Sequence, residues 1–296
     1  MNYYSFHFKN KDPHIYLLNL IKIKILKNYN ILITGHKGFI GNSLLLKLDK
    51  IGYARDKILL FEKEDIDKNK QWETNLRQIV ENSKIIFHIG ADSNTQNEDS
   101  NEVLFYNYYF SKVLFDIAKY FKTKIIYSSS AACYGSGQHP ENIYGWSKYL
   151  AEQYGHSILD KFISLRYFNV YGPGETHKGK MASIANQAML SDEDIFKLFP
   201  GKPKRDFVYI DDVVNANIFA MTNNVPKGIF DVGSGEQNTF EQVLKILDKK
   251  ADYYDKSLIP KSYQFSTLAN KNKFLPEWSP EYNLQQGLEK YMKAMK

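Results

Sequence analysis

Three polar residues in the middle of the chain are spaced for proton transfer. Tyr144 and Lys148 stand four residues apart, so an α-helix would place them on one face. A free tyrosine has a pKa of about 10 and is a poor base near neutrality, but a neighbouring ammonium would favour the phenolate and lower that pKa. Ser130 lies just beyond an apolar run that ends in Tyr127 and Ser128, and its hydroxyl could hold a substrate oxygen near Tyr144. The set predicts a tyrosine base with a serine beside it.

A glycine-rich loop lies near the start of the chain. Gly35, Gly38 and Gly41 separate an apolar run at residues 30–34 from residues 43–51, which have helical spacing. Missing side chains let the backbone turn tightly and approach a pyrophosphate, while the helix N-terminus supplies free N–H groups and a favourable dipole. The order strand, glycine loop, helix predicts a dinucleotide site.

The residues after the second expected strand bear on the choice of dinucleotide. Glu62 could bond the ribose hydroxyls of NAD, whereas Lys63 could meet the 2′-phosphate of NADP. The two side chains favour different cofactors, so the sequence leaves NAD and NADP open.

Strands and helices alternate through the first part of the chain. We expect strands at 57–61, 84–89, 124–128 and 162–166 and helices at 76–80, 102–120 and 144–159. The pattern predicts an α/β fold, a Rossmann-type doubly wound parallel sheet with a smaller C-terminal substrate domain. We expect an N-terminal extension at 1–29, a dinucleotide-binding domain at 30–171 with a returning segment near 207–235, and a mainly substrate-binding domain at 172–296. The later pieces are helices near 182–190, 211–222, 239–249 and 284–296, with N-caps at Thr239 and Asn283, and a strand at 228–232.

The composition is that of a globular protein. Apolar residues make up 43% and charged residues 24% of the 296 residues, and the net charge is +6. Only four of the 39 basic residues are arginine, and the lysines are spread along the chain instead of gathered in one patch, so we expect no nucleic-acid partner. Cys133 stands alone, which fits a reducing compartment. No run is long enough to span a membrane, and no metal-ligand spacing is present, so we expect a cytoplasmic protein without a metal site.

Several ordered motifs together resemble one family. They are the glycine loop, residues 87–91, 127–135, Tyr144 with Lys148, and residues 166–173, 205–212 and 230–235. This chain is similar over residues 30–296 to the extended short-chain dehydrogenase/reductases, the nucleotide-sugar epimerases and dehydratases. Residues 176–183 and 204–209 are most similar to the ADP-glycero-manno-heptose 6-epimerases. Ala131 and Ala132 stand where the dehydratases carry an acidic residue, which counts against a 4,6-dehydratase.

The resemblance implies roles for individual residues. Lys178 would be a second acid/base opposite Tyr144, beside the catalytic Ser130 and Lys148. The remaining cofactor contacts would come from Gly35, Gly38, Phe39, Ile40, Gly41, Glu62, Lys63, Ile89, Gly90, Ala91, Asp92, Asn107 and Val170. The substrate would meet Ser130, Asn169, Lys180, Gln187, Phe199, Gly201, Lys202, Arg205 and Tyr263.

The implied reaction inverts a sugar carbon by transient oxidation and reduction. One NAD or NADP per subunit would be tightly bound and not consumed, and the substrate would be a nucleotide-diphosphate sugar. Because the hydroxyl lies on opposite sides in substrate and product, Tyr144 and Lys178 would each serve one orientation. Two alternatives remain: a 4-epimerase or sugar reductase that works with Tyr144 alone, and a non-catalytic NAD(P)-binding regulator. The family also implies a homo-oligomer.

Overall fold

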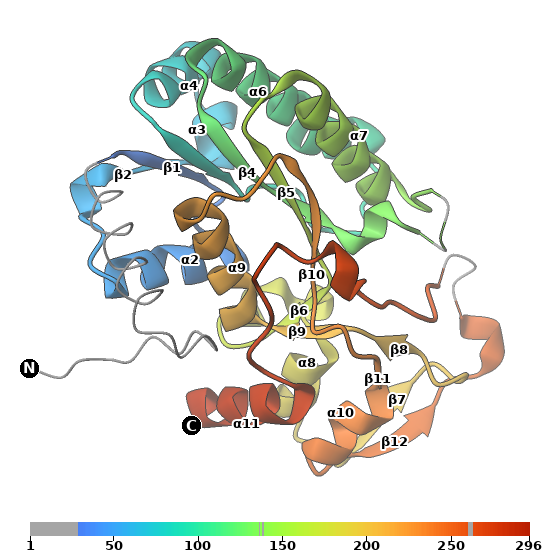
Figure 1. Ribbon diagram of the computed structural model, residues 1–296. Coiled ribbons are helices and arrows are strands. Elements are labelled where there is room, and N and C mark those ends of the chain that lie inside the picture. Colours follow the sequence, from blue (N-terminus) through green and yellow to red (C-terminus); the bar gives the residue numbers. More distant parts are fainter. Residues whose placement is uncertain (1–28, 136, 138, 260–262) are drawn as a thin grey trace, which may run out of the picture.

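A six-stranded parallel sheet forms the centre of the protein (Figure 1). The computed structural model describes residues 29–135, 137, 139–259 and 263–296. The strand order is β10-β5-β4-β3-β1-β2. The bounds are β1 Ile31–Thr34, β2 Ile58–Phe61, β3 Ile85–His88, β4 Lys124–Ser130, β5 Phe162–Tyr167 and β10 Gly228–Val232. The predicted α/β fold with a doubly wound parallel sheet is therefore confirmed.

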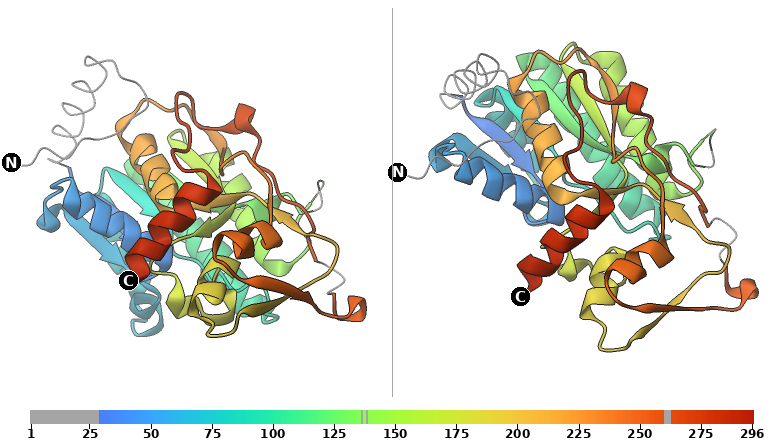
Figure 2. Two further views of the ribbon diagram at one scale, coloured as in Figure 1. Left: turned by 90° about the horizontal axis from the view of Figure 1, so that it is seen from below. Right: turned by 60° about the horizontal axis from the view of Figure 1, so that its bottom comes forward.

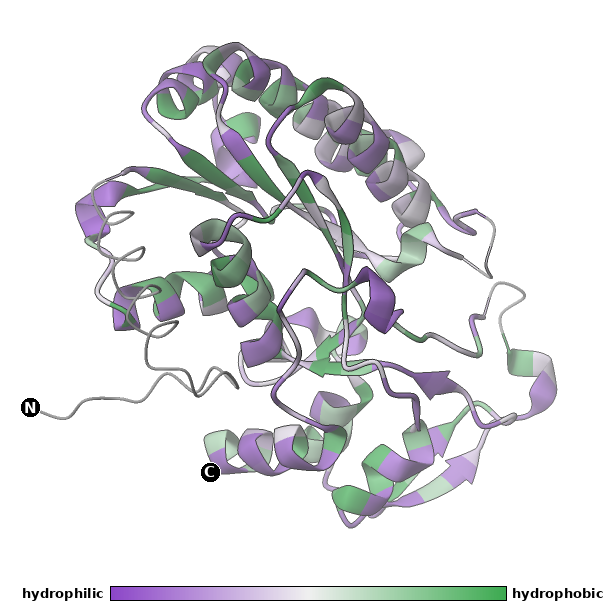
Figure 3. Cartoon of the chain, in the orientation of Figure 1, coloured by the Kyte–Doolittle hydropathy of each residue, from purple (hydrophilic) through white to green (hydrophobic). Residues whose placement is uncertain are grey.

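The two faces of the sheet bury two separate apolar clusters. Ile31 and Ile33 on β1 join one cluster, whereas Leu32 between them joins the other, because successive strand side chains point to opposite faces. Figure 3 shows the resulting apolar strands between helices with polar outer surfaces. The first cluster includes side chains of α2 (Phe39–Lys50) and α9 (Ile210–Thr222), and the second those of α4 (Trp72–Glu81), α6 (Phe110–Phe121) and α7 (Ile143–Ile158). Helices thus cover both faces of the sheet.

Two predicted helices differ from the structure in ways that matter for the site. The helix expected at 43–51 begins at Phe39, because the end of the glycine loop forms its first turn. The helix expected at 102–120 consists of α5 (Ser100–Leu104), a π-helical turn (Phe105–Tyr109) and α6. A π-turn adds one residue and often marks a functional site, and here it contains the buried Asn107.

The C-terminal part contains short elements that the sequence pattern did not predict. Three two-stranded ladders pair β6 (Asn169–Tyr171) with β9 (Phe207–Tyr209), β7 (Ile195–Leu198) with β12 (Lys250–Tyr253), and β8 (Lys204–Arg205) with β11 (Asn238–Thr239). The helix expected at 239–249 ends at Ile246, since residues from Lys250 onward enter β12. Strands of two to four residues are too short to show a period.

The predicted helix caps are confirmed. The side chains of Thr239 and Asn283 accept hydrogen bonds from the backbone N–H groups of Gln242 and Gln286. They begin α10 (Phe240–Ile246) and α11 (Leu284–Met295), and Figure 2 shows α11 from two further directions. The remaining helical segments are α3 Lys63–Asp67, α8 Ile184–Leu190 and the 3₁₀ turns Arg55–Lys57, Ala131–Cys133, Thr176–Met181, Lys256–Leu258 and Lys271–Lys273.

The proposed division of the chain at residue 171 stays a prediction. Strand β10, at 228–232, lies in the central sheet, next to β5. Residues 1–28, which make up almost all of the expected N-terminal extension, lie outside the described residues. Within the described part of the chain, no helix is long and apolar enough to cross a membrane.

Candidate active site

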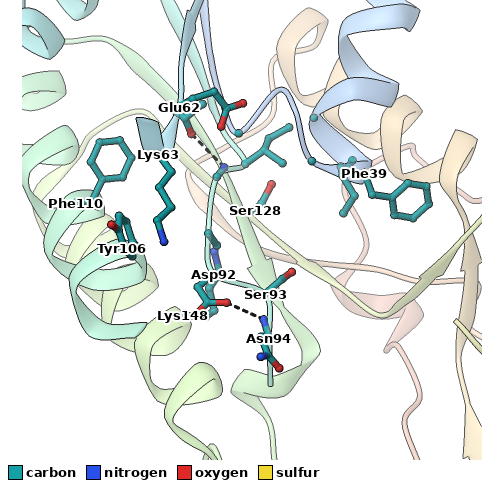
Figure 4. Close-up of a pocket in the computed structure, with 18 of the residues that line it drawn as sticks. Phe39, Glu62, Lys63, Asp92, Ser93, Asn94, Tyr106, Phe110, Ser128 and Lys148 are labelled. Atoms are coloured by element: carbon teal, nitrogen blue, oxygen red, sulfur yellow. Dashed lines mark hydrogen bonds between the residues drawn. The ribbon is translucent and has the colours of Figure 1, made fainter. Parts of the chain in front are cut away.

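A cavity of about 750 Å³ lies at the carboxyl ends of the parallel strands (Figure 4). Ligands bind at this edge in open parallel sheets. Fourteen of the sequence-predicted site residues line it: Gly35, Gly38, Phe39, Ile40, Gly41, Glu62, Lys63, Ile89, Gly90, Ala91, Asp92, Tyr144, Lys148 and Lys178. They come from the loops after β1 and β3, the first turn of α2, the junction of β2 and α3, α7 and the 3₁₀ turn before α8, so segments far apart in the sequence meet around one space.

The glycine loop is closed against the loop that follows β3. Gly35 has φ +73°, and a Cβ there would lie 2.4 Å from Cα of Gly90. A Cβ on Gly41 would lie 2.0 Å from the carbonyl oxygen of Gly35. The first turn of α2 has no side-chain cap and no acidic residue, so its N–H groups and the positive end of the helix dipole remain available to an anion. These residues fit the diphosphate of a dinucleotide.

Glu62 and Lys63 point toward different partners at the end of β2. The Glu62 carboxylate accepts a hydrogen bond from the backbone N–H of Lys37 at 2.7 Å and is 12% exposed. The Lys63 ammonium pairs with Glu102 at 2.9 Å and lies 4.1 Å from the centre of the Tyr106 ring. Figure 4 shows Lys63 and Tyr106 side by side, opposite Phe39 across the cavity. The positive charge of Lys63 is therefore already partnered.

Tyr144 is in the first turn of α7, with its side chain in the cavity. Asn142 caps this turn by accepting a hydrogen bond from the N–H of Gly145 at 2.8 Å. Burial raises the pKa of Tyr144 to about 12, although a hydrogen bond with Ser130 acts in the opposite direction. The sequence-based expectation of a lowered pKa is therefore not met by the chain alone, because loss of hydration outweighs the neighbouring groups. Ser130 itself ends β4 without lining the cavity, and its Oγ accepts from the N–H of Ala132 at 3.1 Å.

Lys148 lies one helical turn beyond Tyr144 and is 2% exposed. Its ammonium nitrogen is 4.3 Å from the centre of the Tyr127 ring. Burial lowers the pKa of Lys148 to about 8, although the negative charges of Cys133 and Glu152 act to raise it. Tyr144 and Lys148 thus share one helix face and one cavity, as the spacing predicted.

Lys178 comes from the 3₁₀ turn between β6 and α8. Its side chain is half-buried and lines the same cavity as Tyr144. The ammonium nitrogen lies 5.5 Å from the centre of the Phe39 ring, and burial lowers the pKa of Lys178. The cavity is therefore lined by two side chains that can each donate or accept a proton, Tyr144 on α7 and Lys178 on the 3₁₀ turn before α8.

Two predicted cofactor residues lie outside the cavity lining. Asn107 is 1% exposed and clamps the backbone of Asp92: its amide donates to the Asp92 carbonyl at 2.9 Å and its oxygen accepts from the Asp92 N–H at 2.7 Å. The same amide donates to Ser147 Oγ at 3.0 Å, which ties the π-turn to α7. Val170 packs against the apolar cluster on the α2 side of the sheet.

The predicted substrate residues fall into two groups. Phe199, Arg205 and Tyr263 lie together: the Phe199 and Tyr263 ring centres are 5.0 Å apart, and the Arg205 guanidinium is 5.4 Å from the Tyr263 ring. Gly201 and Lys202 form the turn beside them with φ +100° and +50°. The other three are bound locally or exposed: Asn169 accepts from Thr267, Gln187 donates to the backbone at 180 and 182, and Lys180 is exposed.

The structure adds cavity residues that the sequence reading missed. Tyr106 and Glu102 reach the cavity from the α5–π segment, and His177 and Met181 flank Lys178. Ser128 and Ser129 precede the predicted Ser130 and were within the quoted motif, so their position could have been inferred. The α5–π residues gave no local signal, because only the pairing of β3 beside β1 brings that segment to the glycine loop. Among the described residues, no group of histidine, cysteine and carboxylate side chains could hold a metal ion.

Comparison with known proteins agrees with this geometry. Residues 31–233 match the NAD dependent epimerase/dehydratase family. An ADP-L-glycero-D-manno-heptose-6-epimerase of Brachyspira hyodysenteriae is 32% identical over 90% of this chain and 97% of its own length. Another, of Cupriavidus pinatubonensis, is 35% identical over 72% of this chain and 75% of its own length. The crystal structure of the Helicobacter pylori ADP-L-glycero-D-manno-heptose-6-epimerase superposes with a TM-score of 0.78 at 29% identity, over 91% and 97% of the two chains. The chain therefore belongs to the NAD dependent epimerase/dehydratase family.

Proposed function

We propose that this protein is a nucleotide-sugar epimerase that inverts C6 of an ADP-glycero-manno-heptose. The observation that carries the proposal is the meeting of Tyr144 and Lys178 in one cavity with the glycine loop. Two relatives named as ADP-L-glycero-D-manno-heptose-6-epimerases support the sugar and the carbon. The chemistry that NAD supplies when bound is reversible acceptance of a hydride.

The chain's own residues would carry the proton transfers. In one epimer the substrate hydroxyl faces Tyr144, with Ser130 beside it through its hydrogen bond to the phenol. In the other epimer the hydroxyl faces Lys178. Each group would act as a base when the alcohol is oxidised and as an acid when the carbonyl is reduced. Arg205, whose guanidinium lies against the Tyr263 ring, would bind the diphosphate part of the substrate as a charge-assisted fork.

For the cofactor, the geometry favours NAD over NADP. The Glu62 carboxylate is at the end of β2, where it would accept hydrogen bonds from the ribose hydroxyls and repel a 2′-phosphate. Lys63, the side chain that could have met that phosphate, is paired with Glu102. Tight retention of the cofactor, assembly into a homo-oligomer and a cytoplasmic location remain predictions.

The decisive experiment follows the configuration at C6. The purified protein is incubated with ADP-D-glycero-D-manno-heptose and catalytic NAD, and in a parallel sample with NADP, and proton NMR follows the sugar. We expect inversion without net reduction of the cofactor, faster with NAD. A matched Lys178→Met variant should bind NAD normally but invert C6 only at a low residual rate, because one of the two proton-transfer groups is gone.

The alternatives have distinct outcomes in the same assay. In a further sample supplied with NADH or NADPH, net consumption of the reduced cofactor would identify a reductase. Full inversion by the Lys178→Met variant would contradict the two-base mechanism. Bound cofactor with no conversion of this sugar would redirect the search to other activated sugars.

A further inference from the structure

The loop that carries Lys178 is closed by a buried carboxylate. Glu175 has 0% exposure, although it is only three residues from the half-buried Lys178. Its Oε1 accepts a hydrogen bond from the N–H of Gly172 at 3.1 Å and from Ser183 Oγ at 2.7 Å, and its Oε2 accepts from the N–H of Ser183 at 2.7 Å. One side chain therefore binds both ends of the segment 172–183.

The backbone between these ends is folded tightly around the carboxylate. The Glu175 carbonyl accepts from the N–H of Lys178 at 2.9 Å, and the Gly179 carbonyl accepts from the N–H of Ala182 at 3.0 Å. Gly172, Gly174 and Gly179 have φ +147°, +100° and +53°, conformations that other residues rarely adopt. A segment with three such residues needs a fixed partner to hold one conformation, and the Glu175 carboxylate is that partner.

A second set of contacts anchors the same loop to the C-terminal helix. Asn186 on α8 donates to Thr176 Oγ1 at 3.0 Å and to the hydroxyl of Tyr291 on α11 at 2.6 Å. Tyr291 is fully buried, and it interacts with the Glu175 carboxylate. The loop, α8 and α11 thus form one hydrogen-bonded unit behind Lys178.

We infer that Glu175 is a positioning residue for Lys178: its carboxylate closes residues 172–183 and so holds the Lys178 ammonium at the cavity. Glu175 does not line the cavity itself. The inference rests on the proposed function for the role of Lys178, whereas the closure of the loop is independent of it. An amide at this position would place an N–H₂ group toward one of the N–H or O–H donors, so Glu175→Gln breaks the closure while it preserves side-chain volume.

The test compares Glu175→Gln with Asp212→Asn. Asp212 is a matched control, because its buried carboxylate also accepts backbone N–H bonds, from Glu281 at 2.8 Å and Tyr282 at 3.1 Å. Hydrogen–deuterium exchange of peptides from residues 172–183 should be faster in Glu175→Gln and unchanged in Asp212→Asn. This measurement needs no substrate, so it stands even if the heptose is not turned over. Unchanged exchange in Glu175→Gln would overturn the loop closure.

The functional arm uses the heptose assay. A displacement of about 1 Å can cost a factor of about 100 in rate, so we expect a fall of about 100-fold in kcat for Glu175→Gln, with KM and NAD binding unchanged. In a Lys178→Met background the same substitution should cause no further loss, since both changes remove one function. An additive loss in the double variant would show that Glu175 acts through some other residue and would overturn the inference. A wild-type protein that leaves C6 unchanged would instead refute the proposed function.

Discussion

The ammonium nitrogen of Lys148 lies 4.3 Å from the centre of the buried Tyr127 ring, so a positive charge sits against an aromatic face inside the protein. Such a contact is attractive, but it does not replace the lost hydration, and burial lowers the pKa of Lys148 to about 8. The positive charge that the proposed mechanism requires beside Tyr144 is therefore held at a cost to folding stability.

Replacing Lys148 should separate stability from activity. We expect Lys148→Met to raise the free energy of unfolding by about 1–3 kcal/mol near pH 7, measured by urea titration, while it abolishes epimerisation. The pKa of the folded lysine lies below its ordinary value of 10.5. The unfolded chain thus binds more protons than the folded protein between about pH 8 and 10.5. The free energy of unfolding of the wild type should therefore rise over that range until it no longer differs from that of Lys148→Met. A variant less stable than the wild type at pH 7 would contradict this reading.

The pH dependence of the reaction should report the same group. Lys148 carries its charge below about pH 8 and loses it above, so we expect kcat/KM to decrease as the pH rises through about 8. An arginine keeps its charge to far higher pH. The alkaline decrease should therefore move upward in Lys148→Arg, whatever the absolute rate. An identical profile in both proteins would assign the decrease to another group.

A buried ion pair joins the helix of Tyr144 and Lys148 to the central sheet. Glu152 on α7 accepts from Arg166 on β5, with Nε at 3.0 Å from Oε2, and from Ser164 Oγ at 2.8 Å. Removal of one partner leaves a buried charge uncompensated, so Glu152→Gln should lower the free energy of unfolding by about 3 kcal/mol. The exposed pair of Lys37 and Glu64 is the control, and Glu64→Gln should cause a far smaller change. Equal effects in the two variants would contradict the prediction.

Two glycines of the cofactor loop should respond differently to alanine. A Cβ on Gly41 would overlap the Gly35 carbonyl at 2.0 Å, whereas one on Gly38 would make an ordinary contact at 3.5 Å. We expect Gly41→Ala to lower the free energy of unfolding by about 1–3 kcal/mol and also to lose NAD binding. Gly38→Ala should fold normally and bind NAD more weakly, because only the approach of the diphosphate is impeded. Calorimetric titration of NAD and thermal unfolding give both quantities, and a fully stable Gly41→Ala would refute the argument.

Cofactor choice should depend on Glu62. Removing a hydrogen bond to a charged group costs about 1.5–3 kcal/mol, so Glu62→Ala should weaken NAD binding at least about tenfold. NADP binding should improve relative to NAD, because the repelling carboxylate is gone. Glu64→Gln, two residues along, is the matched control and should leave the ratio of the two dissociation constants unchanged. A fall in NADP affinity equal to that of NAD would argue that Glu62 only supports the loop through Lys37.

Local patterns in the sequence determined the parallel sheet and much of the cavity. The run before Gly35 became β1, the glycine loop opened α2, and the spacing of Tyr144 and Lys148 placed both on one face of α7. These features depend on periodicity and on missing side chains over a few residues, which a sequence displays directly.

Only the tertiary structure decided the electrostatics and the distant contacts. Burial sets the pKa of Tyr144 above and that of Lys148 below its ordinary value, and burial is a property of the packed chain. Lys63 forms an ion pair with Glu102 because the strand order brings their two segments together. Glu175 accepts a hydrogen bond from Ser183 and so closes the loop of Lys178, because the loop folds back on itself. The sequence thus predicted the reacting groups, whereas the fold decided their charge, their partners and the side from which each enters the cavity.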